Sequence, residues 1–206
     1  MDSVQFDNAG IPMAGNLYLP PEFDPAQQYA AIISVHPGGG VKEQTAGQYA
    51  ERLAAQGYVT LAFDASHQGA SGGEPRRLDV PTNRVGDTFS AVDYLTTLPY
   101  VDNNRIGILG LCAGGGVTIK AASLDRRIKT VATVSGIDVG ATFRRGWNGT
   151  ATVADQLAAL EGIGGLRTAE AGGMTPAYGT YVPELGDTTA PRDLQEAAEY
   201  YLTARG

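Results

Sequence analysis

The sequence predicts an α/β protein, with a mostly parallel sheet that carries helices on both faces. Two observations predict this class. Short apolar runs typical of buried strands alternate with segments whose apolar residues recur every three to four positions. Glycines and polar residues follow these apolar runs directly. Alternating strands and helices connect by right-handed crossovers, which place the strands parallel and the helices against the sheet.

The strands are predicted from apolar or alternating runs. The first two runs flank Asn8–Gly10 and predict an edge hairpin. Tyr29–Val35 is almost continuously apolar, as expected for a central strand buried on both faces. The predicted strands are Val4–Phe6, Asn16–Leu19, Tyr29–Val35, Tyr58–Phe63, Ile106–Leu111 and Ile128–Ser135.

The helices are predicted from apolar spacing and from stop signals. Gly57 and Pro99 end the first two helices. The inner face expected for the first helix is Tyr49, Leu53 and Ala50, and that for the second is Val85, Phe89, Val92 and Leu95. The predicted helices are Ala46–Gln56, Thr82–Leu98, Val117–Ser123, Ala151–Ala169 and Ala190–Ala204.

Polar side chains stand where four predicted strands end. They are His36, Asp64, Cys112 and Ser135. Ligands of open parallel sheets bind beyond the carboxyl ends of the strands, so these residues predict a functional rim.

From Ile137 onward the sequence no longer shows the apolar runs typical of buried parallel strands. We therefore predict a core over 1–136 and a helical cap over 137–206. The last two helices carry apolar stripes, Val153, Leu157, Leu160 and Ile163 in one and Leu194, Ala197, Ala198 and Tyr201 in the other. The alternative is that these helices simply cover the sheet.

Composition narrows the classes of function. The net charge of −7 argues against nucleic acid as a partner. No apolar run is long enough to span a membrane, and the N-terminus shows no secretory signal. The one cysteine cannot form an internal disulfide, which fits a cytoplasmic protein with a free thiol.

The segment Arg105–Gly116 carries the strongest chemical signal. Gly110-x-Cys112-x-Gly114 is the nucleophile-elbow pattern G-x-S-x-G with cysteine in place of serine. A helix N-terminus behind Cys112 favours negative charge, and the amide of Ala113 is placed to bind an oxyanion. A dinucleotide cradle and a purely structural turn are the alternatives, although the spacing G-x-G-x-x-G is absent.

Three motifs together resemble the α/β-hydrolase superfamily, and its dienelactone-hydrolase-like branch in particular. GLCAGGG looks like the cysteine elbow of that branch, and HPGGG at 36–40 is similar to the oxyanion segment of esterases. Asp64 and the Gly69–Gly73 segment are similar to the glycine-rich loop after the fourth strand, with Ser66 where an arginine would stand. The resemblance implies strand order 1-2-4-3-5-6.

The resemblance also implies a mechanism. Cys112 would attack the carbonyl of a small ester, thioester or lactone, while the amides of Ala113 and of Gly38 or Gly39 hold the oxyanion. A histidine oriented by an acid would take the thiol proton. The resemblance implies no metal and no organic cofactor, and it is compatible with an oligomeric protein.

The chain departs from the family pattern in its proton-handling residues. In this superfamily the acid and the histidine follow the nucleophile, but His36 and His67 both precede Cys112. Three accounts are open: a C-terminal part or second polypeptide supplies both residues, the chain binds without turnover, or an upstream histidine substitutes. Asp138 and Asp155 follow Cys112 but follow no suitable strand.

Further residues are candidates for lining the site. His36 is expected to orient the oxyanion segment, and His67 either contacts substrate or is a solvated loop residue. In cysteine members of the branch a glutamate near the oxyanion segment can pair with the thiol, which makes Glu43 a candidate. Trp147, with Arg144 and Arg145, lines a cap pocket or belongs to an ordinary surface loop. We expect Asp64 to be loop scaffolding that accepts backbone N–H bonds.

The expected function is a cytoplasmic cysteine hydrolase of small esters, thioesters or lactones. The rival is a non-catalytic binding protein with the same fold.

Overall fold

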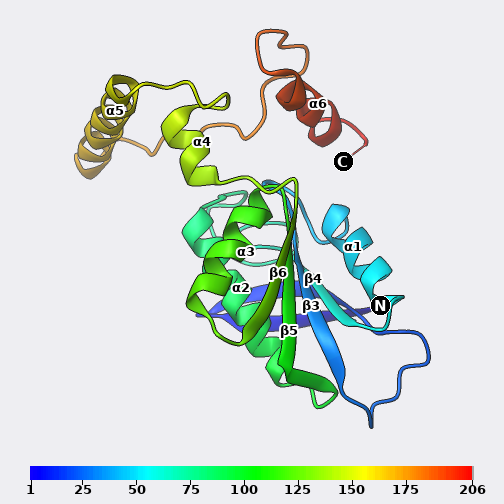
Figure 1. Cartoon of the computed structure of the whole chain (residues 1–206). Helices are drawn as coiled ribbons and strands as arrows, with labels where there is room; N and C mark the ends of the chain where they lie inside the picture. Colours follow the sequence, from blue (N-terminus) through cyan, green and yellow to red (C-terminus); the bar gives the residue numbers. More distant parts are fainter. Residues whose placement is uncertain (206) are drawn as a thin grey trace. The chain divides into compact units, whose positions relative to one another are not determined.

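The computed structural model describes residues 1–205 and divides into two units, Met1–Val139 and the residues from Gly140 onward. In the described chain, the first unit contains all the strands and the first three helices (Figure 1). The strands are β1 (Asp2–Asn8), β2 (Ile11–Tyr18), β3 (Tyr29–Val35), β4 (Val59–Phe63), β5 (Val101–Leu111) and β6 (Ile128–Val134). The helices are α1 (Thr45–Ala54), α2 (Pro81–Thr96), α3 (Ala113–Leu124), α4 (Val139–Arg145), α5 (Val153–Ala171) and α6 (Arg192–Tyr201).

The strands form one sheet in the order β1-β2-β4-β3-β5-β6. The hairpin β1–β2 and the pair β2–β4 are antiparallel, whereas β4, β3, β5 and β6 run parallel to one another. The sequence-based fold class and strand order are therefore confirmed. The hairpin is longer than its short apolar runs predicted, because polar residues outside those runs, such as Asp7 and Asn8, also take part in the pairing.

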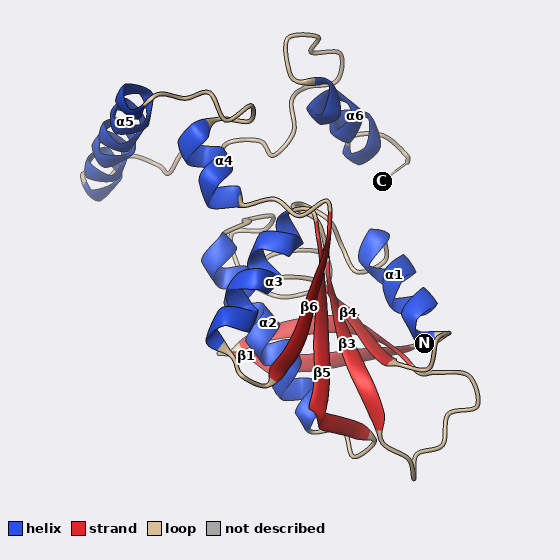
Figure 2. Ribbon diagram, in the orientation of Figure 1, coloured by secondary structure: helices blue, strands red, loops and turns tan. Residues whose placement is uncertain are grey.

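Helices cover both faces of this sheet (Figure 2). The larger core lies on the side of α2 and α3, where Ile33, Leu61 and Ile108 meet Val92 and other helix residues. The second core lies on the side of α1 and contains Ala46, Ala50, Ala62, Leu109 and Leu111. Successive strand residues point to opposite faces, so the apolar runs of β3, β4 and β5 supply both cores.

Small residues make the closest contact between α1 and the sheet. Ala46 and Ala50 are fully buried, whereas Tyr49 and Leu53, which were predicted to point inward, are only half-buried. A helix approaches a sheet most closely where its side chains are smallest, and the larger side chains then lie at the border of the contact.

The inner face of α2 is more polar than predicted. Val92 and Leu95 are buried as expected, but Val85 and Phe89 are half-buried. Fully buried positions near the helix start are polar instead: Arg84, Asp87 and Thr88. Asp87 accepts hydrogen bonds from Asn8 Nδ2 and from the amide and hydroxyl of Ser66, yet burial raises its pKa above the ordinary value.

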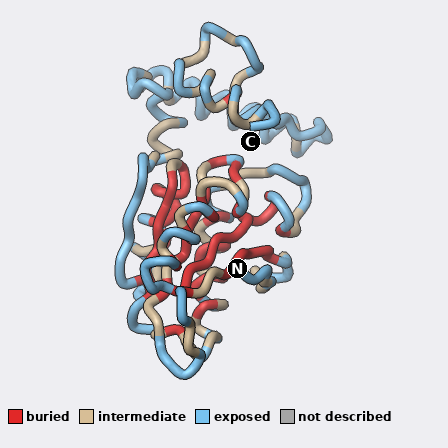
Figure 3. Tube along the Cα trace, turned by 90° about the vertical axis from the view of Figure 1, so that its right-hand side faces the viewer, coloured by how far each residue is buried: buried red, intermediate tan, exposed pale blue. Residues whose placement is uncertain are grey.

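Most described residues of the second unit are exposed, as the pale blue of its trace shows (Figure 3). Among its described residues only Ala198 of α6 is buried, which agrees with the predicted face of that helix. In α5 the predicted apolar stripe Val153, Leu157, Leu160 and Ile163 is present, and each of its side chains is at least 53% exposed. No helix among residues 1–205 is both long and apolar enough to cross a bilayer.

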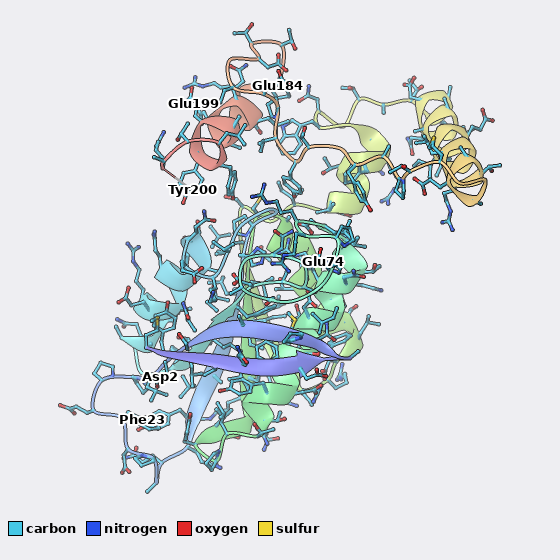
Figure 4. The ribbon with its side chains drawn as sticks, turned by 180° about the vertical axis from the view of Figure 1, so that it is seen from behind. Asp2, Phe23, Glu74, Glu184, Glu199 and Tyr200 are labelled. Atoms are coloured by element: carbon cyan, nitrogen blue, oxygen red, sulfur yellow. The ribbon has the colours of Figure 1, made fainter. Side chains whose placement is uncertain are left out.

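The parallel strands bring the predicted rim residues to one edge of the sheet. His36, Asp64, Cys112 and Ser135 each follow the last residue of a parallel strand directly, in β3, β4, β5 and β6. The long loop from 64 to 80 lies at this edge, where Figure 4 labels its residue Glu74. The rim predicted from the sequence is therefore present as a geometric feature.

Candidate active site

The elbow between β5 and α3 places one thiol at the tip of a sharp turn. Cys112 has φ 53° and ψ −118°, a left-handed conformation that is rare for a residue with a side chain. Strained conformations of this kind persist only where the surroundings impose them, and they concentrate at functional sites. The thiol is half-buried, which differs from the small enclosed hydrophobe of the structural-turn interpretation.

Glycines surround the elbow because side chains do not fit there. A Cβ at Gly110 would lie 2.3 Å from Thr118 Oγ1 and 2.4 Å from the Gly114 carbonyl oxygen. A Cβ at Gly114 would lie 2.4 Å from the carbonyl oxygen of Val35. These distances confirm the expectation that the turn excludes side chains, since the obstructing atoms are mostly backbone.

We expect Gly110→Ala to lower the free energy of unfolding by about 1–3 kcal/mol, because a methyl group must displace closely packed atoms. The control is Gly86→Ala, since Gly86 lies in α2 and no atom lies within 4 Å of its added Cβ. That control should raise stability by about 0.5–1 kcal/mol through helix propensity. Denaturant unfolding measures both variants, and equal effects would contradict this account of the elbow.

The backbone of the elbow is held by its neighbours on both sides. The Cys112 amide donates to Val134 of β6, and its carbonyl accepts from the amides of Gly115 (2.8 Å) and Ile137 (3.0 Å). The amide of Ala113, at the first position of α3, has no acceptor within the described chain. A phosphate cradle needs free amides at 114–116, so the bonded Gly115 amide argues against the dinucleotide interpretation.

The loop Pro37–Gly40, called the oxyanion loop after the role predicted for it, follows β3 beside the elbow. Gly38 is buried and its amide has no acceptor among residues 1–205. Gly39 has a left-handed φ of 66°, and its amide donates to Asp79 Oδ2 at 3.2 Å. The two predicted donors of this loop are thus in different states: one is unpaired and the other is bound to a carboxylate.

His36 anchors the base of the oxyanion loop as a neutral side chain. It is 0% exposed, its Nε2 accepts from the Ala65 amide at 3.1 Å, and its Nδ1 lies 2.6 Å from the Pro37 carbonyl oxygen. One accepting nitrogen and one donating N–H correspond to a neutral ring. Burial, together with the guanidinium of Arg84, lowers the pKa of His36 to about 3, although the bond to Pro37 opposes this.

Asp64 ties Lys42, two residues after the oxyanion loop, to the loop that follows β4. It is 0% exposed and accepts from the Lys42 amide, from Lys42 Nζ and from the Ala70 amide, each at 2.8 Å. It therefore accepts backbone N–H bonds, as expected. Burial alone would lower the pKa of the Lys42 ammonium, but its bonds to Asp64 and Glu43 prevail and raise it.

Glu43 is engaged away from the thiol. Its carboxylate lies 2.6 Å from Lys42 Nζ while its side chain remains 58% exposed. No hydrogen bond connects it to Cys112 within residues 1–205. Pairing of Glu43 with the thiol stays a prediction.

His67 is a structural part of the loop between 64 and 80. It is 7% exposed, which contradicts the interpretation as a solvated residue. Its Nδ1 lies 3.0 Å from the Pro75 carbonyl oxygen, and its amide donates to Gly72. A Cβ at Gly73 would lie 2.9 Å from Nδ1, so the ring packs directly on that glycine. Substrate contact by His67 stays a prediction.

The remaining candidate residues lie in the second unit. The indole N–H of Trp147 donates to Asp193 Oδ2 at 2.9 Å. Arg144 and Arg145 lie in the last turn of α4. Asp155 is the third residue of α5 and forms a capping box with Thr152, which explains this acid without a catalytic role. The pocket expected around Trp147 stays a prediction.

Three charged residues near the oxyanion loop were missed as site residues in the sequence. Asp79 accepts from the Gly39 amide, Arg84 donates to the carbonyl oxygen of His36, and Lys42 pairs with the buried Asp64. Arg84 and Lys42 are 3% and 7% exposed. The sequence signal that could have indicated Arg84 was its spacing in α2. Thr88 follows it by four residues and Ala91 by seven, which places all three on one buried face of the helix. A charged residue on such a face predicts a buried partner, but it does not identify that partner.

The strand order, the left-handed elbow and the glycine-rich loop beside it define the α/β-hydrolase fold. Residues 13–159 match the model of the dienelactone hydrolase family, and the chain belongs to that family.

Relatives support this assignment over nearly the whole chain. The chain is 46% identical to protein YcjY of Escherichia coli over 99% of its length and 68% of YcjY. The crystal structure of protein PA2218 of Pseudomonas aeruginosa superposes with a TM-score of 0.87 at 38% identity, covering 100% of this chain and 64% of that one. A relative named thiohydrolase aneE, from Aspergillus aculeatus, is 33% identical over 66% of this chain and 41% of its own length. The chain thus spans between about two fifths and two thirds of the length of these relatives.

Proposed function

We propose that this chain carries the nucleophile and the oxyanion donors of a hydrolase for small esters, thioesters or lactones. The observation that carries the proposal is Cys112 on a strained elbow, followed by the unpaired amide of Ala113. Cys112 is half-buried at the start of α3, where the positive end of the helix favours negative charge on an oxyanion.

The proposed first step transfers an acyl group to the cysteine. The sulfur of Cys112 attacks the carbonyl carbon, an S–C bond forms, and the carbonyl oxygen takes the negative charge. Amides of Ala113 and of the oxyanion loop stabilise that oxygen, each donor contributing about 3–4 kcal/mol. The C–O or C–S bond to the leaving group then breaks, the leaving group departs with the electron pair, and the thiol proton passes to a base.

We place that base and its acid outside residues 1–206, on a C-terminal part or on a second polypeptide. His36 cannot serve as the base, because both of its ring nitrogens are engaged and it is fully buried. His67 forms no hydrogen bond with Cys112 in the described part of the chain. In this chain alone the thiol proton passes to water or buffer instead. Hydrolysis of the acyl-enzyme needs the missing base to activate water, so this chain is expected to acylate once and then to stop.

Acylation by p-nitrophenyl acetate tests the proposal with the chain as it stands. We expect one equivalent of p-nitrophenolate per chain in a burst, and a mass increase of one acetyl group on Cys112. Cys112→Ala should abolish both signals, because no other thiol is present. Cys112→Ser, which keeps a hydroxyl at the elbow, controls for loss of the fold. A burst that persists in Cys112→Ala would contradict the assignment.

The substrate class can be resolved by the same assay. An acetyl thioester in place of the oxygen ester tests the thioester branch, which the name of the thiohydrolase relative favours. The second candidate function is a non-catalytic binding protein, favoured by the lack of a histidine after Cys112. A folded chain that acylates with neither ester nor thioester would support that candidate.

A further inference from the structure

Arg84 is a buried cation beneath the oxyanion loop. Its side chain is 4% exposed, at the fourth position of α2. Nη2 donates to the carbonyl oxygen of His36 and lies 3.3 Å from His36 Nδ1, Nη1 lies 3.7 Å from Asp79 Oδ2, and Nε has no partner in the described chain. Burying a guanidinium with so few partners is costly, and its contacts converge on the oxyanion loop.

The carbonyl that Arg84 holds is also a contact point of the elbow. A Cβ at Gly114 would lie 2.7 Å from His36 O, so the elbow helix packs against this oxygen with no space to spare. The guanidinium approaches the same oxygen from α2. The position of His36 O therefore sets how the oxyanion loop lies relative to the amide of Ala113.

Asp79 holds the other end of the same loop. Its Oδ2 accepts from the Gly39 amide at 3.2 Å and faces Arg84 Nη1. An amide that donates to a carboxylate is not available to an oxyanion. The amide of Gly38, which lies between the two held points, has no acceptor in residues 1–205.

We propose that Arg84 and Asp79 are a positioning pair that fixes the oxyanion loop at His36 O and at the Gly39 amide, so that Gly38 and Ala113 supply the two oxyanion donors. The proposal rests on the acyl transfer proposed above. A guanidinium suits this task because its two Nη groups reach two acceptors at once, whereas a lysine ammonium is a single point. Neither Arg84 nor Asp79 touches the reacting atoms.

The first test compares Arg84→Gln and Arg84→Lys with the wild-type chain. Two rates are measured on each: the burst with p-nitrophenyl acetate and the alkylation of Cys112 by iodoacetamide. Alkylation needs the thiol but no oxyanion donor. We expect Arg84→Gln to slow the burst about 10- to 100-fold at saturating ester, because one donor is misplaced. The ester concentration at half-saturation and the rate of alkylation should stay within about twofold of the wild-type values. Arg84→Lys should recover part of the burst rate.

Arg105→Gln is the matched control, since Arg105 is a half-exposed arginine of β5 that pairs with Asp102 and should leave the burst unchanged. Asp79 provides a second test in case Arg84→Gln fails to fold. Asp79→Asn keeps an oxygen for the Gly39 amide and should retain most of the burst rate, whereas Asp79→Ala releases the loop and should lose more of it.

Three results would overturn the positioning pair. One is a burst in Arg84→Gln as fast as in the wild type, and another is an equal loss of burst and alkylation, which would locate the effect at the thiol or the fold. The third is equal burst rates in Asp79→Asn and Asp79→Ala. If the wild-type chain gives no burst while its thiol is alkylated, the proposed acyl transfer fails first, and the pair fails with it.

Discussion

Asp64→Ala is expected to lower the free energy of unfolding by about 3–5 kcal/mol, the usual cost of removing one partner from a buried ion pair. Asp64 is fully buried and is the acceptor for two backbone amides as well as for Lys42 Nζ. After its removal, the Lys42 ammonium keeps only the exposed carboxylate of Glu43. Urea unfolding at neutral pH measures the change.

A double-mutant cycle separates the ion pair from the backbone bonds. Lys42→Met removes the buried cation and leaves the stem of the side chain to pack. If the unpaired charge causes most of the loss, Asp64→Ala combined with Lys42→Met will be more stable than Asp64→Ala alone. Asp102→Ala removes an acid from a more exposed pair and should change stability much less. A double variant as unstable as the sum of the two single variants would contradict the buried-pair explanation.

The second large effect concerns acid and His36. The folded protein keeps this ring neutral down to about pH 3, whereas in the unfolded chain it gains a proton near its ordinary pKa of 6.5. The unfolded state therefore binds more protons between these values, and stability falls as the pH falls. The expected slope from His36 is about 1.4 kcal/mol for each pH unit below 6.5.

Comparison with His36→Asn isolates this slope from the titration of acidic groups. The variant should be less stable than the wild type at pH 7.5, because it loses the bonds to Ala65 and Pro37. As the pH falls below 6.5 the difference should shrink, since the variant has no ring to protonate. Unfolding curves collected at several pH values give the difference directly. A constant difference would show that His36 takes up its proton equally in both states.

Most of the fold could be predicted because it depends on local patterns. The runs Tyr29–Val35 and Tyr58–Phe63 are apolar enough to indicate central strands, and their structural bounds differ by at most one residue. The elbow could be placed because Gly110, Cys112 and Gly114 form a contiguous pattern with a steric reason. The inner face of α1 was predicted in part: Ala50 is buried as expected, but Tyr49 and Leu53 are only half-buried, because small residues such as Ala46 make the closest contact with the sheet.

The charged contacts under the rim could not be predicted, because they join residues far apart in the chain. Lys42 and Asp64 are 22 residues apart, and Gly39 and Asp79 are 40 residues apart. Neither pair has a spacing that a single helix or strand imposes. His67 was misjudged for a similar reason, since its burial depends on a loop that folds back through Gly72 and Pro75. Such contacts follow from the strand order and not from local sequence.

The bond from the Ile137 amide to the Cys112 carbonyl makes one proton a reporter on the elbow. An amide proton in a hydrogen bond exchanges with solvent deuterium only when that bond opens. The exchange rate at Ile137 therefore counts how often the turn beneath the thiol comes apart. Ile137 lies in the segment that follows β6, two residues before the first unit ends at Val139.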